Sequence, residues 1–126
     1  MTTAAHSIRA QKAQYPAYAA MKSAIASITR NIAKTHGADR VRANCICPGA
    51  IATEALDEAK ALAVVEYGGE PATALDRYMV EKWGMKVALG RAGQPQEVGE
   101  LIAFLLSERA GYMTGALLNI DGGTDF

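Results

Sequence analysis

The stretch RVRANCICPG, residues 40–49, decides the fold class of this chain. It is a short, mostly apolar run, and Pro48 and Gly49 end it, which is typical of a buried strand that runs into a loop. Successive side chains of a strand point to opposite faces, so one face carries Val41, Ala43, Cys45 and Cys47, and the other carries Asn44 and Ile46. The sequence therefore predicts a buried strand over residues 40–47.

Helix and strand patterns flank this segment on both sides. From Pro16 onward, apolar residues recur at intervals of four, three and four, which is typical of one face of an amphipathic helix; they are Met21, Ile25, Ile28 and Ile32. His36 and Gly37 are suited to end that helix. Near the C-terminus, ALLNIDGG at residues 116–123 has the pattern of a second strand. Strands that follow helices over such distances indicate parallel βαβ units, so we predict an α/β fold.

Residues 54–89 have a different character. Two helical stretches, about 54–66 and 72–88, flank a break at Gly68 and Gly69. The second stretch carries an apolar residue at every fourth position, namely Leu75, Met79, Trp83 and Val87. GRAGQP then indicates a turn, with Pro95 as the first residue of a new helix. That helix has the clearest apolar stripe of the chain, formed by Val98, Leu101, Ile102, Leu105 and Leu106.

Composition and charge limit the classes of function that the protein can have. The chain has 126 residues, which fits one domain, and its 13 basic and 13 acidic residues give a net charge of zero. A balanced charge argues against nucleic acid or an anionic membrane as partner. No apolar stretch approaches the length needed to span a bilayer, and MTTAAHSIRAQK lacks the apolar core of a secretory signal, so we expect a soluble, cytoplasmic protein. No metal site is predicted; Cys45 and Cys47 are expected to be buried small hydrophobic residues.

A tyrosine and a lysine at helical spacing suggest acid–base chemistry. In YAAMK, Tyr18 and Lys22 are four residues apart and share one face of the predicted helix. A nearby ammonium lowers the pKa of a phenol, so the pair suits proton transfer to or from an alcohol or carbonyl. Both residues also suit a plain helix surface, and Tyr78 and Lys82 have the same spacing. Context favours Tyr18, because its helix leads into the strand that ends at Pro48.

Four ordered motifs carry a resemblance to a known family. YAAMK, RVRANCICPGAIAT, GRAGQPQEV and GYMTGALLNIDGG, from about Tyr15 to Gly123, resemble the C-terminal half of a classical-type short-chain dehydrogenase/reductase. The resemblance implies a Rossmann-like, doubly wound parallel sheet. This chain would supply the last two strands, the catalytic helix and the lid helices. It would then be a single, partial domain over residues 1–126, with 54–89 as a substrate-binding lid.

The resemblance also implies roles for individual residues. The activity would be an NAD(P)-dependent oxidoreductase that interconverts an alcohol and a carbonyl by hydride transfer. Tyr18 would be the acid/base, and Lys22 would assist it and bind the nicotinamide ribose. Pro48 and Gly49 would shape the loop beside the nicotinamide. Ile51, through its backbone, and Thr53, through its hydroxyl, would hold the carboxamide. From the residues alone, Pro48–Gly49 is a turn that ends a strand and Thr53 is a helix N-cap.

Two features of the implied site stay open. The family's catalytic serine usually stands about thirteen residues before the tyrosine, where this chain has Ala5. Thr3 is the first candidate for the missing hydroxyl and Ser7 the second. The substrate would be a small alcohol or carbonyl compound. Apolar lid residues allow a hydrophobic substrate, but ordinary helix packing explains them equally well: Leu56, Leu62, Val64, Val65, Tyr67, Met79 and Trp83.

The chain lacks the glycine-rich loop that cradles the cofactor phosphates. It would lack the family's N-terminal half, and strand 40–47 would then expose an unpaired apolar edge. We therefore expect a fragment of a longer enzyme or a chain that needs a complementary partner, or a homo-oligomer. The alternative is a catalytically inactive remnant that acts as an oligomerisation module, because the family associates through the helix that carries the tyrosine and through its C-terminal segment.

Overall fold

The computed structural model describes residues 1–9 and 15–125, which form two compact units. Unit 1 comprises Met1–Pro48 and Val98–Ile120, and unit 2 comprises Gly49–Glu97 with the residues from Asp121 onward. Each unit has its own core.

Unit 1 is built on a parallel sheet. Strand β2 (Cys45–Pro48) lies between β1 (Thr2–Thr3) and β4 (Leu117–Ile120). The side chain of Asn44, only 3% exposed, fixes the start of this sheet. It donates to the Met113 carbonyl at 2.8 Å and accepts from the Ala116 amide at 3.1 Å. Both predicted strands are therefore present and parallel, as an α/β fold requires. The first is shorter than the predicted strand over residues 40–47: it begins at Cys45, and Val41 is 44% exposed.

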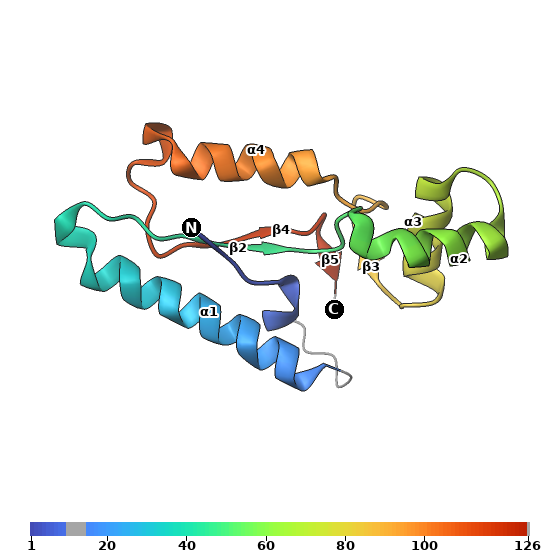
Figure 1. Cartoon of the computed structure of the whole chain (residues 1–126), viewed down its shortest axis with the longest axis horizontal. Coiled ribbons are helices and arrows are strands. Elements are labelled where there is room, and N and C mark those ends of the chain that lie inside the picture. The colour runs from blue at the N-terminus through green and yellow to red at the C-terminus, as the bar shows by residue number, and fades with distance from the viewer. Residues whose placement is uncertain (10–14, 126) are drawn as a thin grey trace. The chain divides into compact units, whose positions relative to one another are not determined.

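Two helices cover the opposite faces of this sheet. Helices α1 (Pro16–Thr35) and α4 (Pro95–Leu106) lie on either side of β2 and β4 (Figure 1). Cys45 and Cys47 pack against Ala26 of α1, whereas Ile46 packs against Leu105 of α4. The predicted alternation is confirmed for Cys45, Ile46 and Cys47, and both cysteines are free and fully buried.

The core-facing side of α1 differs from the predicted one. Met21 is 67% exposed and Ile28 is 58% exposed, although we expected both to face the core. The buried positions of the helix are instead Ala19, Ala26, Thr29 and Ala33. Small side chains let the helix backbone approach the sheet closely, so the large residues are left on the outer side.

Strand β1 was not predicted, and it corrects the expected exposed edge of strand 40–47. Thr2 pairs with Cys45 and Thr3 with Ile46, so that edge has a neighbour in the structure. The Thr2 and Thr29 hydroxyls lie 2.6 Å apart and join β1 to α1, while Thr29 donates to the Ile25 carbonyl at 2.8 Å. The sheet of unit 1 thus has one more strand than the two we expected.

Unit 2 consists of η3 (Glu54–Leu56), α2 (Asp57–Tyr67), α3 (Pro71–Glu81) and an antiparallel pair, β3 (Lys86–Val87) with β5 (Thr124–Asp125). Gly68 and Gly69 have positive φ angles, as the predicted break requires. The predicted helix 72–88 is too long. It ends at Glu81, Gly84 has φ +62, and Val87 belongs to β3. The core of unit 2 contains Leu75, Met79, Met85 and Ala92.

Short 3-10 helices complete the described elements: η1 (His6–Ile8), η2 (Gly37–Asp39) and η4 (Glu108–Ala110). Pro95 is the first residue of α4, as predicted, and His36 directly follows α1. Of the predicted α4 stripe, Leu106 is the exception, because it is largely exposed. Within the described ranges, no helix is long and apolar enough to cross a membrane.

Candidate active site

The first turns of α1 bring Tyr18 and Lys22 together. Pro16 begins the helix, and Tyr18 follows in its first turn with half of its surface exposed. The Lys22 ammonium lies 5.5 Å from the centroid of the Tyr18 ring. The predicted pair therefore shares one face of the helix, with the lysine ammonium over the tyrosine ring.

Thr3 lies beside the same lysine. Lys22 Nζ donates to the backbone carbonyl oxygen of Thr3 at 3.3 Å. Thr3 is the last residue of β1, and its side chain is exposed. The hydrogen bond between Thr2 and Thr29 holds this strand against α1, so a buried contact sets the distance between Thr3 and the Tyr18–Lys22 pair.

Ser7 has an unusual environment. Its hydroxyl oxygen is buried and has no hydrogen-bond partner among the residues that the structure describes. Buried hydroxyls without a partner are rare in folded proteins, and each calls for an explanation. Ser7 belongs to η1, which packs against α1.

The predicted cofactor loop begins at the end of β2. Pro48 closes the strand opposite Ile120, and Gly49 follows it. A Cβ on Gly49 would lie 2.8 Å from both Cα and Cβ of Asp121, a distance that ordinary contacts do not reach. Close packing against Asp121 therefore requires a glycine at this position. A turn that merely ends a strand would not require one.

Ile51 and Thr53 lie on an extended segment that pairs with the GRAGQP turn. The Gly93 amide donates to the Ala50 carbonyl at 2.9 Å, and the Gly93 carbonyl accepts from the Ala52 amide at 2.8 Å. Ile51 lies between these two bonds, and its own amide takes part in neither. Thr53 occupies the N-cap position of η3 but makes no side-chain capping bond. In the described part of the chain, neither the Ile51 amide nor the Thr53 hydroxyl has a hydrogen-bond partner.

The GRAGQPQEV motif is held by an ion pair. Arg91 makes two hydrogen bonds to the Glu97 carboxylate, at 2.6 and 2.9 Å, and Glu97 also accepts from the Gln94 amide. The bond to Arg91, followed by the bond from the Gln94 amide, lowers the pKa of Glu97 to about 2. The pair ties the turn at Gly93 to the start of α4, and so it fixes the strand-like contact with Ile51.

The second tyrosine–lysine pair has structural partners. The Tyr78 ring lies edge-on to the rings of Tyr67 and Trp83, with centroids 6.5 and 5.8 Å away. Lys82 forms an ion pair with Glu66, and this bond raises the pKa of Lys82. The YMVEK pair therefore joins α2 to α3.

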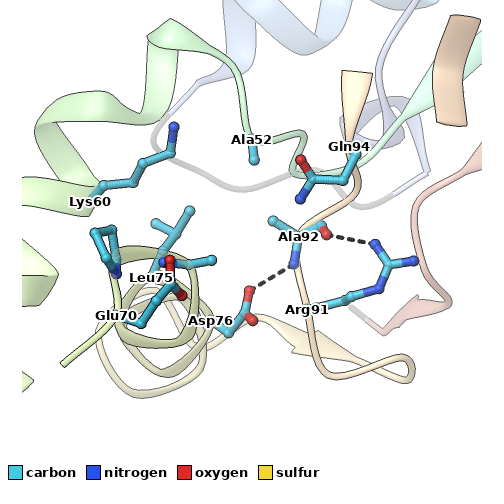
Figure 2. A pocket seen from close by; sticks show the side chains of 10 residues that line it. Ala52, Lys60, Glu70, Leu75, Asp76, Arg91, Ala92 and Gln94 are labelled. Carbon is cyan, nitrogen blue, oxygen red and sulfur yellow. Dashed lines mark hydrogen bonds between the residues drawn. The ribbon is translucent and has the colours of Figure 1, made fainter. Parts of the chain in front are cut away.

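Unit 2 also contains a cavity of about 300 Å³ that the sequence did not indicate. It lies between α2, α3 and the turn 91–94, and Figure 2 shows Lys60 and Gln94 on opposite sides of it. Asp76 accepts a hydrogen bond from the Ala92 amide at 2.8 Å. The lining residues are Ala52, Lys60, Glu70, Pro71, Ala72, Leu75, Asp76, Arg91, Ala92 and Gln94. Their spacing in the sequence follows no helix or strand period, so no pattern could have predicted the cavity.

Comparisons with known proteins agree with this architecture. The model of a family described as enoyl-(acyl carrier protein) reductase matches residues 1–125. The chain is 36% identical over 106 residues to a meso-2,3-butanediol dehydrogenase from Serratia marcescens, covering 84% of this chain and 36% of the relative.

Solved structures give the same picture. A 4-hydroxyisoleucine dehydrogenase complexed with NADH matches with a TM-score of 0.76 and 30% identity, over 96% of this chain and 44% of that one. A blue fluorescent protein from a metagenomic library, in complex with NADPH, matches with a TM-score of 0.70 and 30% identity, over 96% and 42%.

The chain belongs to the short-chain dehydrogenase/reductase family. The Rossmann-like fold implied by the sequence motifs is confirmed, and the chain corresponds to the C-terminal part of that fold. It spans less than half the length of the relatives that it matches.

Proposed function

We propose that this chain carries the acid–base half of an NAD(P)-dependent oxidoreductase that interconverts an alcohol and a carbonyl. The observation that supports it most is the position of the Lys22 ammonium, between the Tyr18 ring and the Thr3 carbonyl. Relatives named as dehydrogenases, and neighbours bound to NADH or NADPH, support the same reaction class.

In this proposal Tyr18 moves the proton. Its phenol is half exposed, so it can reach a substrate oxygen. The phenolic O–H donates its proton when an alkoxide forms, and the phenolate accepts one when an alcohol is oxidised. Lys22 stabilises the negative charge on the phenolic oxygen while the proton is away.

The loop after β2 fits the carboxamide of a nicotinamide. A carboxamide needs a donor for its oxygen and an acceptor for its NH₂ group. The Ile51 amide and the Thr53 hydroxyl have no partner among the described residues, so they can supply both. When bound, the nicotinamide would supply or accept the hydride. Pro48 and Gly49 shape the turn that leads to these groups, and Lys22 would also bind the ribose.

Two hydroxyl groups compete for the role of polarising the substrate oxygen. Thr3 is exposed and lies next to Lys22, which favours it on position. The buried hydroxyl of Ser7 has no hydrogen-bond partner among the described residues. This favours Ser7, because a substrate oxygen would supply the missing hydrogen bond. Thr3 remains our first candidate, and substitution at each position distinguishes them.

Residues 54–89 are proposed as the substrate lid. Its apolar residues fall into two groups in the structure: Met79 and Leu56 pack in the core of unit 2, whereas Leu62 and Val65 are exposed. The exposed group supports contact with a small hydrophobic substrate. The cavity beside Lys60 and Asp76 adds polar groups to the same lid.

A second candidate function is an oligomerisation module without catalytic activity. The exposed Met21 and Ile28 lie seven residues apart on the outer side of α1, where a second copy could cover them. Replacing both by lysine should convert an oligomer to a monomer in light scattering. A wild-type protein that is already monomeric would contradict this candidate.

Cofactor binding distinguishes the two functions. The melting temperature of the wild-type protein should rise with NADH or NADPH, because a ligand that binds only the folded state stabilises it. Thr53→Val should reduce that rise, whereas Thr35→Val, at an exposed threonine that ends α1, should leave it unchanged. If neither nucleotide shifts the wild-type melting temperature, the oxidoreductase proposal fails for this chain.

A further inference from the structure

A second pocket lies in unit 1, at the amino ends of the strands. Its volume is about 620 Å³, and it is lined by Gly37, Arg40, Val41, Arg42, Leu106, Glu108, Gly111 and Thr114. These residues precede β2, follow α1 or connect α4 to β4. Tyr18 lies near the other end of α1, about 26 Å away at 1.5 Å per helical residue. The pocket is therefore separate from the proposed acid–base pair.

Neither arginine of this pocket forms an ion pair with a carboxylate among the described residues. Arg42 donates to two backbone carbonyls, those of Met113 at 3.3 Å and Ser107 at 3.2 Å, which fixes its guanidinium without cancelling its charge. Arg40 makes no ion pair with any carboxylate that the structure describes. Two guanidinium groups thus line one pocket, the first immobilised and the second available to a ligand.

The backbone at Arg40 is in an unfavourable conformation. Its φ of 63° and ψ of 20° lie in the left-handed region, and no other non-glycine residue described has a positive φ. A glycine would adopt this conformation without the steric conflict of a Cβ, so the fold does not call for an arginine here. The conformation belongs to the C-cap of η2, so Arg40→Gly can remove the guanidinium and keep the turn.

We propose that this pocket binds a sugar phosphate. The guanidinium of Arg40 forms no ion pair among the described residues, and arginine donates two hydrogen bonds at once to a phosphoryl group. Arg42, held by the Met113 and Ser107 carbonyls, adds a second positive charge to the pocket lining. The Glu108 carboxylate lines the same pocket and accepts hydrogen bonds from hydroxyl groups. The exposed side chains of Val41 and Leu106 line the same pocket and offer apolar surface to the carbon skeleton of the sugar. The volume lies within the range of small-molecule sites. This inference is independent of the proposed oxidoreductase activity.

Isothermal titration with glucose 6-phosphate tests the proposal. Wild-type protein should bind it, and neither glucose nor glucuronate should compete, because the first lacks the phosphoryl group and the second carries a carboxylate at C6, where glucose 6-phosphate carries the phosphorylated hydroxymethyl group. Arg40→Gly suits the left-handed backbone, so it should preserve the fold and weaken binding about tenfold. Arg30→Ala, at an exposed arginine on α1, should leave binding unchanged.

Substitution at Glu108 tests the sugar part of the proposal. Glu108→Gln removes a negative charge, so inorganic phosphate should bind roughly threefold more tightly. It also replaces a charged acceptor by a neutral one, so glucose 6-phosphate should gain less than inorganic phosphate does. Three results would overturn the assignment: no binding of glucose 6-phosphate to the wild type, unchanged binding by Arg40→Gly, or equal affinity for glucuronate.

Discussion

The ammonium of Lys22 donates to the backbone carbonyl oxygen of Thr3, and this bond joins α1 to β1 beside the Tyr18 ring. The acceptor is neutral, and no ion pair with Lys22 occurs in the described part of the chain. The lysine is therefore held in place without losing its charge to a carboxylate. Lys22 thus carries a positive charge without an ion-pair partner next to a half-exposed phenol, and the proposed acid–base role of Tyr18 rests on this arrangement.

The buried contact behind this arrangement can be tested for stability. Thr29→Val keeps the shape of a fully buried side chain but removes the hydroxyl that pairs with Thr2. Because the Thr2 hydroxyl then loses its partner, we expect a loss of about 1–2 kcal/mol in the free energy of unfolding. Urea denaturation measures the loss, with Thr35→Val as the exposed control. A loss equal to that of the control would mean that this contact does not fasten β1.

Ser7 offers a case where stability and activity should move in opposite directions. Ser7→Ala removes a buried hydroxyl that has no partner among the described residues, so stability should stay constant or rise by about 1 kcal/mol. If Ser7 polarises the substrate oxygen, turnover should fall in the same variant. Thr3→Val should lower turnover instead if Thr3 has that role. Unchanged turnover in both variants would exclude both hydroxyls.

The packing of the cofactor loop predicts a cost for any side chain at Gly49. In Gly49→Ala the new Cβ would meet Asp121 backbone and side-chain atoms at 2.8 Å, so we expect a loss of about 1–3 kcal/mol in stability. Gly99→Ala is the matched control. A Cβ at Gly99 meets nothing within 4 Å in α4, and alanine is the better helix former, so stability should rise by about 1 kcal/mol. Equal effects at the two positions would contradict the tight packing at Gly49.

The Arg91–Glu97 pair predicts a specific dependence on pH. The folded pKa of Glu97 is about 2, below the ordinary value of 4.5, so the pair stabilises the fold above pH 4.5. This contribution is lost as the pH falls from 4.5 toward 2, because the carboxylate becomes protonated. Glu97→Gln should therefore lose less stability than the wild type across that window in urea denaturation. Glu100→Gln, at an exposed glutamate of the same helix, should behave like the wild type.

The sequence identified the strands and the order of helices because these depend on local patterns. Cys45, Ile46 and Cys47 alternate between two buried faces as predicted, and Pro95 begins a helix where its ring is tolerated. The predicted strand began five residues too early, because residues 40–44 share the apolar pattern but lie outside the sheet. The same reasoning chose the wrong core-facing side of α1, because a search for apolar periodicity gives most weight to large side chains. Met21 and Ile28 mark the outer side of the helix, while Ala26 and Ala33 make the close contact.

Other features depended on contacts between residues far apart in the sequence. Strand β1 has two residues, too few for a period, and it forms only because Cys45 and Ile46 offer a partner. Apolar residues recur at every fourth position from Leu75 through Trp83 to Val87, but the helix ends before Trp83 and Gly84 has a positive φ angle. The sequence pattern therefore continues beyond the helix. The requirement for glycine at Gly49 arises from Asp121, seventy-two positions away, which no motif could indicate.

The two tyrosine–lysine pairs provide the most direct test of the proposed function. Tyr18→Phe and Tyr78→Phe each remove one hydroxyl from the same Tyr-x-x-x-Lys spacing, and only the first removes the proposed proton donor. Turnover with a panel of ketones and secondary alcohols, followed by nicotinamide absorbance, should fall about 100-fold or more in Tyr18→Phe. Tyr78→Phe should keep wild-type turnover. Equal turnover in the two variants, or no turnover by the wild-type protein, would contradict the proposal.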